Sequence, residues 1–101
     1  MIFCFDLDGT LCDTNELDYG NAIPRPDYIK RVNQLYDAGH TIIIDTARGT
    51  TSGIRWAAKT RRQLKAWGLK FHQLRAGTKF YADVYIDDRS QHPTEFFRCH
   101  P

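Results

Sequence analysis

The chain has little cysteine and no long apolar run, and both shortages exclude classes of protein. Its three cysteines, Cys4, Cys12 and Cys99, are an odd set without a Cys-x-x-Cys spacing, which argues against a disulfide framework and a zinc site. No apolar stretch approaches the roughly 20 residues that a membrane-spanning helix needs. The N-terminus lacks a basic segment followed by an apolar one, so it does not read as a secretory signal. We therefore expect a soluble protein of the reducing cytoplasm.

An excess of charge of one sign is also missing. The formal net charge is only +2, from 14 Lys and Arg against 12 Asp and Glu. This balance does not favour a dedicated nucleic-acid binder, which usually presents a strongly basic surface. The 101 residues, of which 42% are hydrophobic, fit one ordinary globular domain with one core. We expect a single domain over residues 1–101 and no membrane partner.

Short apolar runs alternate with amphipathic segments along the chain. Alternating strands and helices predict βαβ units and a parallel sheet, so the expected class is α/β. Specifically, we expect a three-layer Rossmann-like sheet with helices on both faces and no cap domain. The segment between the first strand and the first helix reads as loop with at most a short hairpin. The predicted strands are 2–5, 41–44, 71–74 and 84–86, and the predicted helices are about 26–38, 53–68 and 94–98.

Three of the apolar strands end in a polar cluster. Because the carboxyl ends of parallel strands form one edge of a sheet, we expect the clusters to meet there. Four carboxylates brought together repel one another unless they share a hard cation such as Mg²⁺. A bound Mg²⁺ commonly shares its coordination shell with phosphate oxygens, which indicates a phosphate ester or anhydride as substrate. The clusters are Asp6 with Asp8, Thr46 with Arg48, and Asp87 with Asp88.

The residues of this edge, taken in order, resemble the four motifs of the haloacid dehalogenase superfamily of phosphatases and phosphotransferases. The run Asp6-Leu7-Asp8-Gly9-Thr10 matches its first motif, D-x-D-x-T. A strand-ending Thr46, then Lys79, then the acidic pair at 87–88 match the later motifs. The resemblance is strongest to small capless members linked with surface-sugar pathways, which have runs similar to residues 46–49 and 82–89.

This resemblance implies a division of labour between two acids. Asp6 would be the nucleophile that forms an aspartyl phosphate, and Asp8 the general acid that then becomes the base. Asp6 would start ionised and Asp8 protonated. Metal ligands would be Asp6, the backbone carbonyl of Asp8, and Asp87 or Asp88, between which the residues do not decide. The implied substrate contacts are Thr10, Thr46, Ala47, Arg48 and Lys79.

The lead prediction is a Mg²⁺-dependent phosphatase of a small metabolite, either a sugar phosphate or a nucleotide-sugar intermediate. Without a cap the pocket should be open, so a neighbouring subunit of a homo-oligomer could complete it. A polynucleotide 3′-phosphatase and a receiver-like phospho-acceptor domain are the alternatives. Hydrolysis and phosphoryl transfer stay equally open. The polynucleotide alternative draws on the basic residues Arg55, Lys59, Arg61, Arg62 and Lys65.

Overall fold

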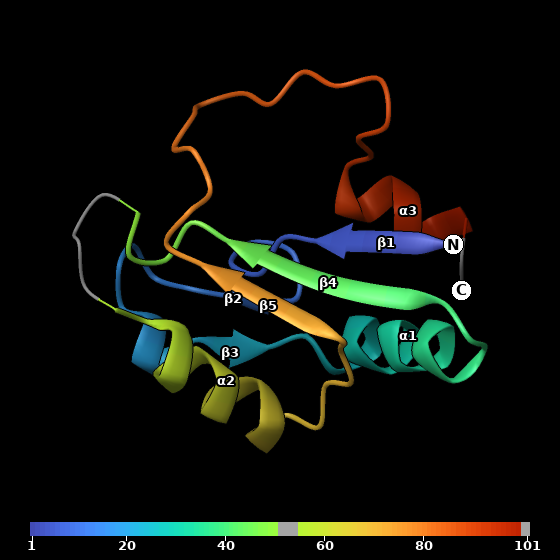
Figure 1. The fold of residues 1–101 in the computed structure, drawn as a ribbon, viewed down its shortest axis with the longest axis horizontal. Helices are drawn as coiled ribbons and strands as arrows, with labels where there is room; N and C mark the ends of the chain where they lie inside the picture. The colour runs from blue at the N-terminus through green and yellow to red at the C-terminus, as the bar shows by residue number, and fades with distance from the viewer. Residues whose placement is uncertain (51–54, 100–101) are drawn as a thin grey trace.

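The computed structural model describes residues 1–50 and 55–99 and shows an α/β fold with a parallel sheet (Figure 1). The sheet has the strand order β1-β4-β5, and both pairings are parallel. Its strands are β1 (Ile2–Phe5), β4 (Thr41–Thr46) and β5 (Gln73–Ala76), and its helices are α1 (Pro26–Asp37), α2 (Ala57–Ala66) and α3 (Pro93–Cys99). The predicted α/β class with flanking helices is confirmed.

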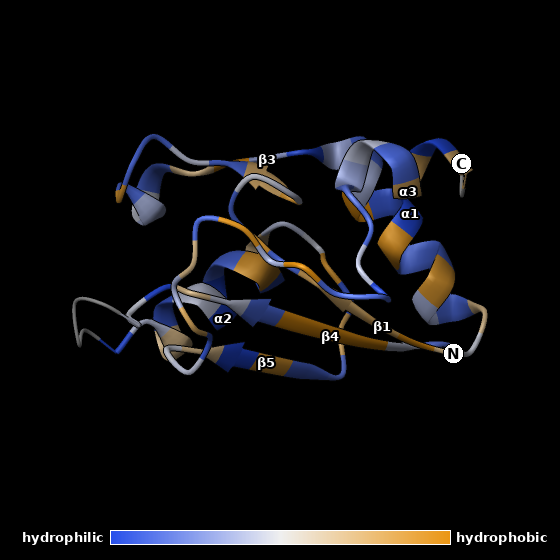
Figure 2. Cartoon of the chain, turned by 90° about the horizontal axis from the view of Figure 1, so that it is seen from above, coloured by the Kyte–Doolittle hydropathy of each residue, from blue (hydrophilic) through white to orange (hydrophobic). Residues whose placement is uncertain are grey.

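The core lies on one face of this sheet. Phe5 pairs in register with Ile44, so the two side chains share a face. That face packs against Val32 of α1, Leu64 of α2 and Phe97 of α3, all of which are buried. Figure 2 shows α1 and α3 on the same side of the strands. The three strands lie in the sheet in the same order as in the sequence, so both crossover connections run in the same direction across the sheet. Because such connections are right-handed, α1 and α2 lie on the same face.

The opposite face of the sheet is more exposed than the face that carries the core. In β4 buried and half-buried residues alternate, so Ile44 is fully buried while Ile43 is not. On the neighbouring strands Cys4 and Arg75, which share the face of Ile43, are exposed. No helix of the described residues covers this face.

The prediction of a strand at residues 84–86 is wrong. No helix or strand forms between β5 and α3, and Figure 1 shows this segment arching from one to the other. Val84 is 70% exposed and Ile86 is 94% exposed. A run of β-forming residues states only a local preference, and a strand also needs a neighbouring strand to satisfy its backbone. Among the described residues, β1 pairs with β4 alone.

The helix predicted from residue 53 begins later. Residues 53 and 54 lie outside the described residues, and α2 begins at Ala57. Thr60 is fully buried together with Leu64, whereas Ala57 and Ala58 are exposed. The polar Thr60, and not the small alanines, therefore occupies the inner face of α2.

The segment before α1 forms the short hairpin allowed by the sequence. Strands β2 (Cys12–Asp13) and β3 (Ile23–Pro24) pair antiparallel, with the short 3₁₀ helix η1 (Tyr19–Asn21) between them. Cys12 is fully buried and anchors this hairpin to the core. No helix in the described part of the chain is long and apolar enough to cross a bilayer.

Candidate active site

A tight turn directly after β1 positions the first two acids. The backbone carbonyl of Leu7 accepts hydrogen bonds from the N–H groups of Thr10 and Leu11, at 3.0 and 2.9 Å. Gly9 has φ +82°, a conformation that residues with a side chain rarely adopt. Leu7 itself is fully buried, which ties the turn to the core. The chain therefore turns tightly at Gly9, and Asp6 and Asp8 stand at the carboxyl edge of the sheet.

Asp6 meets Lys79 at this edge. The Nζ of Lys79 lies 3.4 Å from Oδ1 of Asp6, and the Asp6 side chain is still 43% exposed. Burial raises the pKa of Asp6 above its ordinary value, although Lys79 and the backbone N–H of Leu7 act in the opposite direction. The structure thus joins the first predicted site residue to one far along the chain and leaves its carboxylate open to solvent.

Asp8 has a different environment, because its carboxylate forms an ion pair with Arg48. Nε of Arg48 donates to Oδ2 at 2.9 Å and Nη2 donates to Oδ1 at 2.8 Å, a bidentate ion pair. The hydroxyl of Thr14 donates to Oδ1 at 2.6 Å. Burial raises the pKa of Asp8, but the hydrogen bonds from Arg48 and Thr14 outweigh it and hold that pKa below its ordinary value.

The shift of Asp8 runs against the expectation that this group starts protonated, because its lowered pKa favours the carboxylate. The cause is the distribution of cations. Arg48 pairs with Asp8 at both carboxylate oxygens, whereas Lys79 approaches Asp6 at a single, longer distance. In this conformation Asp8 is held as a carboxylate. The spacing of residues in the sequence could not show that Arg48 pairs with Asp8 and not with a ligand.

Arg48 is buried, which corrects its predicted part as a substrate contact. Only 1% of its surface is exposed. Its Nη1 donates to Thr60 Oγ1 at 3.2 Å and to Gln63 Oε1 at 2.6 Å. The ring of Tyr19 covers the guanidinium at 4.8 Å. The buried Arg48 side chain therefore acts on the site through its ion pair with Asp8 and not through direct contact with a substrate.

The remaining predicted contacts lie around the same edge. Thr46, at the end of β4, is 1% exposed, and its Oγ1 accepts from the backbone N–H of Arg48 at 3.3 Å. Thr10 and Ala47 are half-buried. Their position agrees with the predicted edge, and their contact with a substrate stays a prediction.

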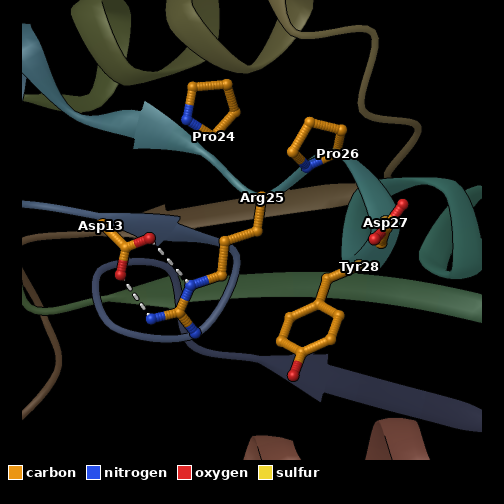
Figure 3. Close-up of a pocket in the computed structure, with 6 residues that line it drawn as sticks. All are labelled: Asp13, Pro24, Arg25, Pro26, Asp27 and Tyr28. Carbon is orange, nitrogen blue, oxygen red and sulfur yellow. Dashed lines mark hydrogen bonds and ion pairs between the residues drawn. The ribbon is translucent and has the colours of Figure 1, made fainter.

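Arg25 braces the turn after β1 from behind. Its Nη1 donates to the carbonyls of Gly9 and Thr10, at 3.1 and 3.2 Å, and its Nη2 donates to Asp13 at 2.5 Å. Figure 3 shows this ion pair in a surface pocket of about 440 Å³. Neither Asp6 nor Asp8 lines that pocket, so it lies outside the predicted site. No sequence signal pointed to Arg25, because its contacts with the turn after β1 are to backbone carbonyls.

The structure does not bring Asp87 and Asp88 to the other acids. Both are exposed, and Oδ1 of Asp87 accepts from the backbone N–H of Arg89 at 2.8 Å. That N–H and the neighbouring Asp88 lower the pKa of Asp87. Within residues 1–50 and 55–99, no three His, Cys, Asp or Glu gather closely enough to hold a metal ion. The reason is the missing strand at 84–86, which was to deliver the pair to the sheet edge.

Sequence reasoning missed Thr60 and Gln63, which hold Arg48 from α2. A signal was available in the helix period, because positions 60, 63 and 64 fall on one face of a helix. Polar residues beside a buried leucine on that face indicate a buried polar partner. The partner could not be named, since Arg48 comes from another segment.

Comparison with known proteins adds relatives of two kinds. No protein-family model and no curated protein matches the chain. A crystal structure of a target protein from Vibrio cholerae is similar, with 30% identity and a TM-score of 0.83, over 94% of this chain and 85% of that one. The two proteins belong to one family. The description of the Vibrio member names no activity.

The fold of this family extends to a phosphatase. D,D-heptose 1,7-bisphosphate phosphatase from B. bronchiseptica, in complex with magnesium and phosphate, matches with a TM-score of 0.54 and 19% identity. The match covers 88% of this chain, which spans about half (53%) of the phosphatase. At this identity the similarity shows a shared fold. The Rossmann-like architecture expected from the sequence is thus found in a known phosphatase.

Proposed function

We propose that the chain is a Mg²⁺-dependent phosphatase of the haloacid dehalogenase kind, acting on a phosphate monoester of a small metabolite. The observation that carries the proposal is the pair of Asp6 and Lys79 at the carboxyl edge of a parallel sheet. A partly exposed carboxylate beside an ammonium group offers a nucleophile next to a cation that can stabilise a phosphoryl group. Asp8 stands two residues away for proton transfer.

In the proposed reaction an Oδ of Asp6 attacks phosphorus. The new O–P bond forms as the P–O bond to the leaving alcohol breaks, which gives an aspartyl phosphate. Water then attacks the same phosphorus, orthophosphate leaves and Asp6 is regenerated. Asp8, which has to be protonated when the substrate binds, gives that proton to the leaving oxygen and then, as a carboxylate, takes one from the attacking water. The second of these steps has the better support, because Arg48 holds Asp8 as a carboxylate.

The residues present fit a magnesium ion in part. Asp6 supplies a hard carboxylate oxygen, and Arg48 occupies the side chain of Asp8, which agrees with Asp8 contributing its backbone carbonyl. Asp87 and Asp88 belong to the exposed segment and would have to approach to complete the set. When bound, the ion would neutralise negative charge on the phosphate and the carboxylates.

The proposed substrate is a sugar phosphate or a nucleotide-sugar intermediate of the kind used in surface polysaccharide synthesis. Support comes from the fold shared with a phosphatase of a heptose bisphosphate. A polynucleotide 3′-phosphatase has less support. On α2, Lys59 and Arg62 point to one side of the helix while Arg61 and Lys65 point to another. Lys59 covers the ring of Trp56 and Arg61 that of Phe71, so the basic residues do not form one strip.

The deciding experiment measures orthophosphate release from sugar phosphates, sugar bisphosphates, nucleotides and a 3′-phosphorylated oligonucleotide, with Mg²⁺ or with EDTA. We expect turnover of a sugar phosphate that needs Mg²⁺, and a loss of about 10³-fold or more in Asp6→Asn, since the nucleophile is removed. Asp37→Asn is the matched control, because Asp37 pairs with Lys70 on the surface. An inactive wild type across the panel, or an Asp6→Asn variant that keeps its rate, refutes the proposal.

A homo-oligomer is part of the same proposal. The segment between β5 and α3, which carries Lys79, exposes Phe80 (86%), Tyr81 (72%) and Ile86 (94%). Large apolar side chains gathered on one exposed segment commonly mark an interaction surface. A second copy of the chain would cover them and enclose the open site. Sedimentation at several concentrations should show a dimer or larger species, and a monomer with full activity would contradict it.

A further inference from the structure

Arg48 is the largest fully buried side chain in the described part of the chain. A buried guanidinium is costly unless its donors and its charge are all matched. Here the charge is matched by Asp8, at the edge where the proposed reaction takes place. A buried ion pair of this kind can give a side chain, here that of Asp8, a single orientation.

The contacts of Arg48 hold its guanidinium from both ends. Nε and Nη2 face the two oxygens of Asp8, while Nη1 faces Thr60 Oγ1 and Gln63 Oε1. Because the guanidinium is a rigid planar fork, fixing Nη1 also fixes the direction of the other two nitrogens. The shortest of these bonds, at 2.6 Å, is the one to Gln63. Gln63 therefore aims Arg48 at Asp8.

Gln63 also connects this cluster to the hairpin. Its Nε2 donates to the backbone carbonyl of Tyr19 at 2.8 Å, and the Tyr19 ring lies over the guanidinium. Tyr19 in turn contacts the Trp56 ring edge to face, with centroids 5.1 Å apart. Two segments, α2 and the hairpin, thus hold one arginine, and its Nε and Nη2 reach a single carboxylate.

We propose that Arg48 is a positioning residue that fixes the carboxylate of Asp8 for proton transfer, and that Gln63 holds Arg48 in place for this task. The inference rests on the proposed function, since it concerns the acid and base of that reaction. Without Arg48, the hydroxyl of Thr14 and the thiol of Cys12 would still hold Oδ1 of Asp8, but Oδ2 would lose its hydrogen bond from Arg48. A misplacement of about 1 Å at a reacting group can cost on the order of 10²-fold in rate.

The test uses Gln63, because replacing a buried arginine risks the fold. Gln63→Met keeps the length of the side chain and removes the acceptor for Nη1, and Gln63→Glu keeps an acceptor. We expect Gln63→Met to lower kcat on p-nitrophenyl phosphate about tenfold with KM within about twofold, and Gln63→Glu to lose less. Ala66→Met, exposed on the same helix, is the control and should leave the rate unchanged.

A double-mutant cycle separates positioning from general packing. If Gln63 acts through Arg48 on Asp8, Gln63→Met should cause no further loss once Asp8→Asn has been made. An equal loss in both backgrounds, or a rise in KM in place of the fall in kcat, overturns the inference. An inactive wild type instead refutes the proposed phosphatase function itself.

A measurement that does not depend on catalysis tests the contact between Arg48 and Asp8 directly. In ¹⁵N-labelled protein, the Nε–H of Arg48 should exchange with solvent at least about tenfold more slowly than that of exposed Arg62, because it is buried and bonded to Asp8. Asp8→Asn and Gln63→Met should each speed this exchange. Exchange as fast as that of Arg62 in the wild type would contradict the arrangement on which the inference depends.

Discussion

The ammonium group of Lys79 lies 3.4 Å from the carboxylate of Asp6, and this contact ties the segment after β5 to the turn after β1. The Tyr85 ring lies 4.9 Å from the same Nζ, and its hydroxyl donates to the backbone carbonyl of Phe80. Lys79 is thus held from its own segment while it reaches across to the acid. The site joins the first strand to a stretch of chain that has no regular structure.

Replacing Lys79 tests whether this contact serves the reaction. Lys79→Met should lower kcat/KM by about 10²-fold, because a cation beside the phosphoryl group is lost, and Lys79→Arg should keep part of the rate. Lys70→Met removes a lysine whose partner, Asp37, lies outside the site, and it should be neutral. Steady-state kinetics on the best substrate of the panel measure all three variants. Equal effects at Lys79 and Lys70 would contradict a role for Lys79.

The two acids of the turn should affect stability in opposite directions. The pKa of Asp6 is raised in the folded protein, so its ionised form costs stability, and Asp6→Asn should raise the urea midpoint at pH 7. The pKa of Asp8 is lowered, so its ionised form contributes stability, and Asp8→Asn should lower that midpoint. Midpoints that move in the same direction would contradict the two environments.

The same shift of Asp8 predicts a pH dependence. A carboxyl group whose folded pKa is depressed stabilises the fold above its unfolded pKa, and this stabilisation is lost as the pH falls through the folded value. The ordinary pKa of Asp is 3.8, so the loss of stability due to Asp8 should occur below about pH 4. Urea unfolding between pH 7 and pH 3 should show a smaller decline in Asp8→Asn than in the wild type. A parallel decline would show that Asp8 is not the group responsible.

Adjacent residues of β4 test the assignment of the core to one face. Ile44 is fully buried against the helices, so Ile44→Ala should cost about 3 kcal/mol of unfolding free energy. Ile43 points to the opposite, half-exposed face, and Ile43→Ala should cost about 1 kcal/mol. Urea unfolding of both variants measures the difference. Equal losses would mean that the second face is covered as well as the first.

The cysteines should differ in reactivity. Cys4 and Cys99 are exposed, while Cys12 is buried and its burial raises its pKa to about 11. The thiolate is the reactive form, so a disulfide reagent at pH 8 should label Cys4 and Cys99 in the native protein and Cys12 only in urea. Peptide mapping by mass spectrometry identifies the labelled sites. Native labelling of Cys12 as fast as that of Cys99 would contradict its place in the core.

Local patterns were sufficient for most of the fold. The apolar runs ending at Phe5 and Thr46 form neighbouring strands, and the segment between Pro26 and Gly39 forms a helix, because burial and capping preferences there agree. The same reasoning failed at Val84 to Ile86, where a strand-forming run finds no partner. Local preference and tertiary structure agree where a segment has a core to face.

The candidate site also has some features that the sequence predicts and others that only the tertiary structure decides. From the sequence alone, strand ends placed Asp6, Asp8 and Thr46 at one edge, since parallel strands end on the same side of a sheet. Tertiary structure alone decided which cation meets which acid, because Arg48 and Lys79 are long, flexible side chains whose partners depend on what surrounds them. Backbone periodicity fixes where a residue stands. The direction in which a charged side chain points is decided by the buried groups, here Thr60 and Gln63, that satisfy its remaining donors.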